Sequence, residues 1–259
     1  MKKLVIVALA VFAAAAIVRA EFGTAVTARA DDAHEITVFA AASLREAFED
    51  LEKTFEAKSH FKVRLNFAGS QELRTQIEHG AAVDVFASAD QKHMDALVTA
   101  KLAAAPKTFA RNMPVIIVPK GNPGKVRSFE ELPSAKKIVI GVAEVPIGNY
   151  TLQILDKAGA AFKEKVMANV ASRELNVRQV SAKVSLGEAD AGVVYRTDAM
   201  AGKDKVEIIE IPAKFNVVAE YPVAVLTKAP QAAAARAFVD LLLSSDGQKR
   251  LVAAGFVAP

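Results

Sequence analysis

Cysteine is absent from all 259 residues of the chain. Its absence excludes disulfide bonds, thiolate metal sites and cysteine nucleophiles. It also excludes the lipid that some exported proteins carry on a cysteine. Aromatic residues are scarce, at 7% of the chain, whereas hydrophobic residues reach 52%. We therefore expect a mainly aliphatic core.

Recognisable catalytic and metal-binding motifs are missing as well. The chain has no G-x-S-x-G elbow, no Walker loop and no G-x-G-x-x-G. None of its histidines, His34, His60, His79 and His93, lies at zinc-ligand spacing or beside a nucleophile. We expect the side chains of the last three to be solvated. The sequence therefore favours a binding protein without a cofactor over an enzyme.

A basic excess is missing once the first thirty residues are set aside. The whole chain has 33 Lys and Arg against 29 Asp and Glu, and residues 1–30 hold four of the former and one of the latter. The remaining 29 basic and 28 acidic residues leave a net charge of +1. No basic stripe alternates with aromatic residues. Nucleic-acid binding is therefore not expected.

The first thirty residues have the pattern of a signal peptide. Lys2 and Lys3 precede an apolar run over residues 4–18, and Ala28-Arg29-Ala30 forms a small-x-small cleavage site. The alternative is an uncleaved anchor, but a run of fifteen residues is short for a membrane span. We predict a signal peptide at residues 1–30, removal near Ala30, a periplasmic location and no stable membrane insertion afterwards.

Beyond the signal, apolar strands alternate with amphipathic helices, which predicts an α/β fold. We expect strands at residues 35–39, 61–67, 83–87, 115–118, 137–142, 191–195, 206–211 and 220–226. Helices are expected from residue 43, at 71–78, after 90, briefly at 128–133, from within 144–151 through 158, and at 177–184, 231–243 and 246–253. Both halves of the chain repeat the same strand-turn-helix unit.

This repetition predicts two lobes with a ligand cleft between them. The chain is expected to cross near Met113 and to return near Tyr221 and Pro222. Lobe I would then comprise residues 31–112 plus 223–259, and lobe II residues 113–222. Each lobe would hold a mixed sheet flanked by helices.

Two strand-to-helix junctions carry a serine among small residues. Ser43 follows Ala40-Ala41-Ala42, and Ser70 follows Ala68-Gly69. Small residues let a ligand approach the backbone, and a helix start offers free N–H groups and a positive dipole end to an anion. The alternative role is helix capping, for which Ser43 has Glu46 three residues on, whereas Ser70 has Leu73 at that position.

Two further junctions follow in the second half. At the first, Gly148 allows close backbone approach; at the other, a strand ending at Tyr195 leads to Asp198. We expect Asp90 to cap a helix and Arg178 to be solvated rather than to serve as a counter-ion. Asp84 is expected to have a structural hydrogen-bonding role.

Helix starts and hydroxyls give a site whose polar groups are mostly donors. A fully deprotonated oxyanion only accepts hydrogen bonds, so a donor-only pocket suits it, whereas a protonated phosphate would need an acceptor.

Six motifs then occur in order and together resemble one known family. They are Val38-Phe39-Ala40-Ala41-Ala42-Ser43-Leu44, Ala68-Gly69-Ser70, Asp84-Val85-Phe86-Ala87-Ser88-Ala89-Asp90, Val145-Pro146-Ile147-Gly148-Asn149-Tyr150, Gly192-Val193-Val194-Tyr195 and Glu220-Tyr221-Pro222-Val223-Ala224-Val225. Over residues 35–257 the chain resembles the periplasmic molybdate-binding proteins of molybdate ABC transporters.

The resemblance implies a type II-like periplasmic-binding-protein fold. It also implies high-affinity binding of molybdate, and of tungstate, by a monomer that delivers the ion to the permease of an ABC importer. A receptor for sulfate or phosphate is the alternative within this class, and a periplasmic hydrolase of a small anion is the less favoured alternative outside it.

The resemblance also implies the ligand-binding residues. These are the hydroxyls of Ser43 and Ser70, the backbone amides of Ile147 and Val177, and the hydroxyl of Tyr195. The metal would enter only within the molybdate oxyanion held by these residues. Isoleucine at 147 departs from the alanine or valine common in the family, yet it keeps the N–H group. Tyr150 and Tyr221 are interpreted as packing or hinge residues.

Overall fold

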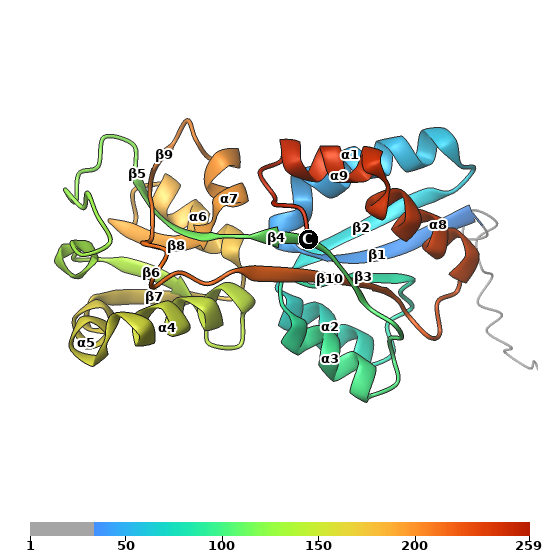
Figure 1. The fold of residues 1–259 in the computed structure, drawn as a ribbon, viewed down its shortest axis with the longest axis horizontal. Helices are drawn as coiled ribbons and strands as arrows, with labels where there is room; N and C mark the ends of the chain where they lie inside the picture. Colours follow the sequence, from blue (N-terminus) through green and yellow to red (C-terminus); the bar gives the residue numbers. More distant parts are fainter. Residues whose placement is uncertain (1–33) are drawn as a thin grey trace, which may run out of the picture. The chain divides into compact units, whose positions relative to one another are not determined.

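A computed structural model describes residues 34–259, which form one compact unit. Two five-stranded sheets organise this unit (Figure 1). The predicted signal peptide at residues 1–30 lies outside the described residues. Among the residues that are described, no helix is long and apolar enough to cross a membrane.

The first sheet has the strand order β2-β1-β3-β10-β4. Strand β1 runs parallel to β2 and β3, and β10 runs antiparallel to β3 and β4. The strands span Glu35–Ala41 (β1), Lys62–Ala68 (β2), Val85–Ala87 (β3), Lys107–Asn112 (β4) and Ala219–Val225 (β10). We call this sheet and its helices lobe I.

Helices cover both faces of the first sheet (Figure 1). A 3-10 turn at Ala42–Leu44 (η2) leads into α1 (Arg45–Lys58), which lies on one face with α8 (Ala232–Leu243) and α9 (Ser245–Ala253). Helices α2 (Ser70–Glu78) and α3 (Gln91–Thr99) lie on the other face. Helices α1 and α2 each begin where a neighbouring strand ends, so their N-termini lie at one edge of the sheet.

The second sheet repeats this arrangement, with the order β7-β6-β8-β5-β9. Strand β6 runs parallel to β7 and β8, whereas β5 runs antiparallel to β8 and β9. The strands span Pro114–Pro119 (β5), Ile138–Gly141 (β6), Val170–Glu174 (β7), Ala191–Tyr195 (β8) and Val206–Ile209 (β9). We call this sheet and its helices lobe II.

Helices of lobe II also lie on both sides of their sheet (Figure 1). They are a 3-10 turn at Leu132–Ser134 (η3), α4 (Pro146–Ala158), α5 (Ala160–Ala168), α6 (Val177–Ser185) and α7 (Arg196–Ala201). Helix α4 begins soon after β6, and α6 begins soon after β7. The two sheets therefore each present helix starts beyond the ends of their parallel strands.

The predicted alternation of strands and helices and the mixed sheets are confirmed, but three elements had not been foreseen. Strands β4 and β7 are edge strands with polar sequences, and an edge strand need not show an apolar pattern. Helix α5 follows α4 after a single glycine, Gly159. The short helix expected at 128–133 is only the 3-10 turn η3.

The crossings between the sheets lie close to the expected positions. Strand β4 ends in the first sheet at Asn112 and β5 begins in the second at Pro114. The chain leaves the second sheet after Ile209 and enters the first at Ala219. Because residues 34–259 form one compact unit, the division at 112/113 and 222/223 stays a prediction.

Aromatic residues are few, and one group of them packs helices together in the core of lobe I. The ring of Phe238 lies 6.0 Å from that of Phe48 and 5.4 Å from that of Phe55, which fastens α8 to α1. Asp84, directly before β3, accepts hydrogen bonds from the N–H groups of Thr37 (2.8 Å) and Gln231 (2.6 Å). The structural role expected for Asp84 is confirmed.

Gly148 allows α4 to approach the end of β6, as the sequence predicts. A Cβ atom at this position would lie 1.9 Å from the carbonyl oxygen of Val142 and 2.6 Å from that of Gly141. These obstacles are backbone atoms, so a side chain cannot be accommodated by a rotamer change. Because residue 148 has no side chain, the first turn of α4 can pack directly against the end of β6.

An arginine of lobe II, Arg178, joins the lobes through two carboxylates. Asp198 in α7 is 1% exposed, and its Oδ1 lies 2.8 Å from Nε of Arg178. The same guanidinium pairs with Glu46 of α1, with 2.8 Å between Nη1 and Oε1. The expectation that Arg178 is solvated is wrong, because acidic groups from both lobes hold it.

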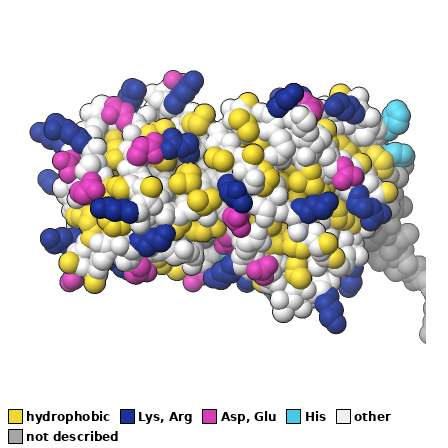
Figure 2. Space-filling view, in the orientation of Figure 1, with side chains coloured by type: hydrophobic (Ala, Val, Ile, Leu, Met, Phe, Trp, Pro, Cys, Tyr) yellow, Lys and Arg dark blue, Asp and Glu magenta, His cyan; other side chains and the backbone are white. Residues whose placement is uncertain are grey.

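On the face shown in Figure 2, Lys and Arg side chains are spread widely, and Asp and Glu lie among them. This mixture agrees with the near-neutral balance of the sequence after residue 30. The view thus adds no basic patch on this face that would suit nucleic acid.

Replacing Gly148 should displace the start of α4. We expect Gly148→Ala to lower the free energy of unfolding by about 2 kcal/mol or more, since the added methyl group must push backbone aside. Gly202→Ala is the matched control, because a Cβ there meets nothing closer than 3.5 Å. Denaturant unfolding of both variants measures the difference; equal stabilities would contradict the close approach.

The stability of the fold should depend on the ionisation of Asp198. Burial raises the pKa of its carboxyl from 3.8 to about 7, although Arg178 opposes the shift. Between about pH 4 and 7 the folded chain then binds more protons than the unfolded chain, so this group's contribution to stability falls as pH rises through that range.

Asp198→Asn removes this titration. We expect the unfolding free energy of the variant, relative to the parent chain, to rise from pH 4 to pH 7 and then to level off. Urea unfolding of both proteins at several pH values measures the difference. Parallel curves for the two proteins would show that Asp198 does not titrate in this range.

Candidate functional site

A small pocket lies between lobe I and lobe II, where the helix starts of the two sheets meet. About 210 Å³ of space free of protein atoms, part of it open to solvent, lies within it. All five residues predicted to bind the ligand line it: Ser43 and Ser70 from lobe I, and Ile147, Val177 and Tyr195 from lobe II. The pocket thus suits a small ion in contact with both lobes.

Ser43 lies within the 3-10 turn η2 and is 2% exposed. Its hydroxyl is 2.9 Å from the hydroxyl of Tyr221 on β10. The alternative reading of Ser43 as a helix cap is wrong, since Ala41 and Leu44 hold the N-cap positions of η2 and α1. When Tyr221 donates to Ser43, the serine keeps its own proton for a ligand.

Ser70 is the first residue of α2 and is 1% exposed. The preceding residue, Gly69, is the N-cap, and its N–H group donates to Oε2 of Glu72 at 3.2 Å. The hydroxyl oxygen of Ser70 instead accepts a hydrogen bond from the N–H of Ala89 at 3.0 Å. Because that bond occupies a lone pair and not the proton, Ser70 too can donate into the pocket.

Ile147 and Val177 bring backbone amides to the pocket from the starts of α4 and α6. They are the second and first residues of these helices, where an N–H group has no partner within the helix. Asn176 caps α6 by accepting from the N–H of Gln179 at 3.1 Å, which leaves the amide of Val177 available. Both helix starts also turn the positive ends of their dipoles to this place.

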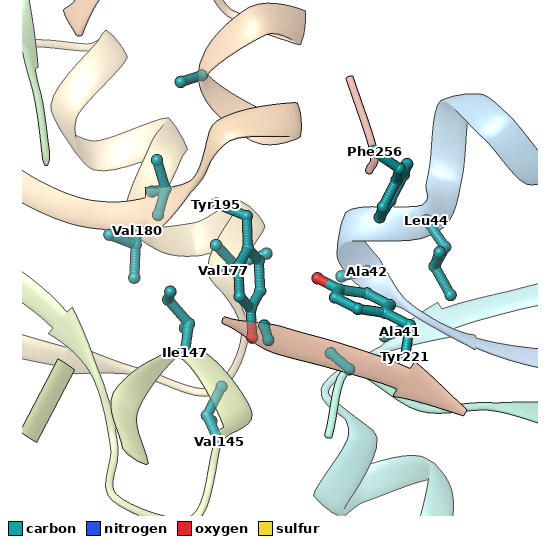
Figure 3. Packing of buried hydrophobic residues seen from close by; sticks show 14 of the residues in the cluster. Ala41, Ala42, Leu44, Val145, Ile147, Val177, Val180, Tyr195, Tyr221 and Phe256 are labelled. Atoms are coloured by element: carbon teal, nitrogen blue, oxygen red, sulfur yellow. The ribbon is translucent and has the colours of Figure 1, made fainter. Parts of the chain in front are cut away.

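The bulky side chain of Ile147 packs into the core of lobe II. Its side chain is fully buried and belongs to the same hydrophobic cluster as Val180. Figure 3 shows this side chain pointing toward Val180 and not toward Tyr221 across the lobes. The departure from the family pattern therefore leaves the amide in place.

Tyr195 ends β8 and places its ring between the lobes (Figure 3). The ring centroid lies 5.7 Å from that of Tyr221 and 6.4 Å from that of Tyr150. The side chain is 1% exposed, and its hydroxyl has no hydrogen-bond partner within residues 34–259. A buried hydroxyl left without a partner costs about 1–3 kcal/mol, which a ligand oxygen here would recover.

The phenol of Tyr195 is held in its protonated form. Burial raises its pKa well above the ordinary value of 10.0, and nearby Tyr221, Tyr150 and acidic groups act in the same direction. The hydroxyl therefore remains a hydrogen-bond donor throughout the range in which proteins are folded.

Uncharged residues make up the whole lining of the pocket. Besides the five predicted residues, it consists of Ala41, Ala42, Ala68, Gly69, Ala89, Val145, Pro146 and Asn176. A negative ion here would meet hydroxyls, amides and helix dipoles, and no counter-charge. Arg178 follows Val177 in the chain but is not among the lining residues, and its guanidinium is taken by Glu46 and Asp198.

The lining of this pocket offers few groups suited to catalysis or to binding a bare metal ion. No histidine or carboxylate lines it, and the part of the chain that the structure describes has no group of three or more potential metal ligands. His93, expected to be solvated, is instead 2% exposed, and its Nε2 lies 2.9 Å from the carbonyl oxygen of Glu144 in the other lobe. Asp90 caps α3 by accepting from the N–H of His93, as expected.

Sequence reasoning missed the residues that support the donors. Tyr221 was interpreted as packing or hinge, but its hydroxyl meets Ser43 across 178 positions of sequence. The N–H of Ala89 and the cap Asn176 were also not foreseen. A serine, threonine, aspartate or asparagine directly before an amphipathic run is the signal that could have identified Asn176.

Comparisons with known proteins agree with this arrangement. The pattern of the bacterial extracellular solute-binding protein family matches residues 36–257. The molybdate-binding protein ModA of Mycobacterium tuberculosis is 41% identical over 230 residues, covering 88% of this chain and 86% of that protein. ModA of Escherichia coli is 36% identical over 240 residues, covering 89% and 90%.

A solved structure supports the fold. The periplasmic molybdate-binding protein of Azotobacter vinelandii superposes with a TM-score of 0.77 at 22% identity, over 86% of this chain and 99% of that chain. The predicted two-lobed α/β fold with mixed sheets is thereby confirmed. With the family pattern running through nearly all of residues 34–259, this chain belongs to the bacterial extracellular solute-binding proteins.

Proposed function

We propose that the protein binds molybdate in the pocket between its lobes. The hydroxyls of Ser43, Ser70 and Tyr195 and the amides of Ile147 and Val177 would donate hydrogen bonds to the oxygens of the ion. The observation that carries this proposal is the buried Tyr195 hydroxyl, which has no partner among the described residues and lies in a pocket without charged residues.

The donor set also defines the ion's chemistry. Molybdate is tetrahedral, doubly negative and fully deprotonated at neutral pH, so it only accepts hydrogen bonds. A pocket lined by donors from two lobes suits such an ion and disfavours a protonated phosphate, which would need an acceptor. The relatives called molybdate-binding proteins support this choice of ion.

Tungstate should bind in the same way, because it has nearly the size of molybdate. Sulfate is smaller, so some donors would lie too far from its oxygens to form short bonds. Sulfate and phosphate receptors remain the alternatives within the class. A hydrolase is disfavoured because none of the pocket residues is a base that could activate a nucleophile.

The bound ion would next pass to a transporter. We propose that the mature protein is a periplasmic monomer, exported by the segment at residues 1–30, and that it delivers molybdate to the permease of an ABC importer. Membership of the solute-binding family supports this role. Closure of two lobes on a ligand is a common form of hinge motion in such receptors.

Ligand-dependent melting tests the choice of ion. At a hundred times its Kd, a ligand adds about 2.7 kcal/mol to stability, which corresponds to a rise in Tm of roughly 5–10 °C for a chain of this size. We expect this rise with molybdate and tungstate and little change with sulfate or phosphate at equal concentration. A rise in Tm with sulfate alone would contradict molybdate as the ligand and identify sulfate instead.

Removing single donors tests the residues. We expect Ser43→Ala, Ser70→Ala and Tyr195→Phe each to weaken molybdate binding about 10- to 100-fold, since a hydrogen bond to a charged group is worth about 1.5–3 kcal/mol. Tyr150→Phe is the matched control for the phenol, and Ser134→Ala, which is exposed, for the serines. Calorimetric titration measures the Kd; unchanged affinity in all three variants would remove the assignment.

A further inference from the structure

Three side chains of lobe I reach across to the helix starts of lobe II. The first is Gln71 in α2, whose Nε2 donates to the carbonyl oxygen of Leu175 at 2.7 Å. Leu175 lies two residues before Val177, the residue that presents an amide from α6. The contact thus fixes the loop that leads into this helix start.

The second side chain is Glu46 in α1. It receives both terminal nitrogens of Arg178, with 2.8 Å between Nη1 and Oε1. Arg178 directly follows Val177, and its Nε lies 2.8 Å from Asp198 within lobe II. The guanidinium is therefore held in a defined direction by carboxylates of both lobes, in the two-pronged geometry that arginine favours.

The third side chain is His93 in α3. Its Nε2 lies 2.9 Å from the carbonyl oxygen of Glu144, three residues before Ile147. The imidazole is 2% exposed, so this contact between the lobes is shielded from water. It holds the segment that leads into α4, the other helix start of the pocket.

These contacts share one arrangement. Each amide that lobe II presents to the pocket is flanked by residues that lobe I holds: Leu175 and Arg178 beside Val177, and Glu144 before Ile147. We propose that Glu46, Gln71 and His93 are positioning residues, which hold the two lobe II amides against lobe I and thereby set how long the bound oxyanion stays. This inference rests on the proposed binding function.

None of the three positioning residues lines the pocket, so they would act on the ion only through the amides. A bound ion surrounded by both lobes can leave only when the lobes separate, and separation breaks these contacts. Their loss should therefore raise the dissociation rate, in which most affinity differences among variants of one site arise.

Gln71→Met tests the first contact, because methionine keeps the length of the side chain and removes the donor. We expect molybdate to dissociate about 2- to 10-fold faster, in line with the net worth of one hydrogen bond. Gln76→Met is the control on the same helix, where the glutamine side chain accepts a hydrogen bond from Asn66 within lobe I. Release of radiolabelled molybdate into an excess of unlabelled ion measures the rate.

Glu46→Gln tests the ion pair. We expect dissociation about 2- to 5-fold faster, since the pair is partly exposed and weakened by solvent. Glu49→Gln is the control, because Glu49 pairs with Arg45 inside α1. In both tests the control variant, which loses a contact within lobe I, should release molybdate at the parental rate, which separates positioning from a general loss of stability.

The separation of the lobes can be measured without any ligand. Since the chain has no cysteine, Lys53→Cys on α1 and Lys165→Cys on α5 give two defined sites for spin labels. In this labelled protein, we expect the double variant Gln71→Met, Glu46→Gln to show a larger share of long distances between the two labels. The comparison is with the double control variant Gln76→Met, Glu49→Gln.

The outcomes distinguish the two proposals. Failure of the parent chain to bind molybdate would overturn the proposed function, and the spin-label distances would still decide whether these residues hold the lobes together. Binding by the parent chain, with dissociation rates and distances in the variants equal to those of the controls, would overturn the positioning role alone.

Discussion

Under the proposed function, the structure must hold a doubly negative ion away from water without a counter-charge, and the rest of the site depends on this constraint. The cost of stripping water from such an ion must be met by donors that already point to it before it arrives. The lining supplies hydroxyls and backbone amides from short turns between strands and helices. The repeated strand-turn-helix unit in both sheets is the economical way to bring several helix starts to one place.

The hydroxyls and amides of the pocket stay available as donors because neighbouring residues cap the helices in their place. Glu72 satisfies the N–H of Gly69, and Asn176 satisfies that of Gln179. The hydroxyl of Ser43 is oriented by Tyr221, and that of Ser70 by the amide of Ala89. Serines that look like caps in the sequence are thereby released from capping, which explains why their surroundings, and not the serines alone, define the pocket.

The sequence predicted the features that depend on local pattern. The strand-to-helix junctions, the role of Asp90 as a cap and the close approach at Gly148 each follow from a few adjacent residues. Contacts across the fold could not be predicted in this way: the partners Glu46 and Arg178 are 132 positions apart. The edge strands β4 and β7 were not predicted for another reason: an edge strand has one open side, so polar residues can occupy it and no apolar pattern is needed.

The row of rings between the lobes has an optical consequence. The chain contains three tyrosines and no tryptophan, and the ring of Tyr195, which lines the pocket, contacts the rings of both Tyr150 and Tyr221. Ultraviolet emission excited at wavelengths that phenylalanine does not absorb therefore originates from these three rings. The molecule thus carries its own tyrosine reporter at the place where its lobes meet.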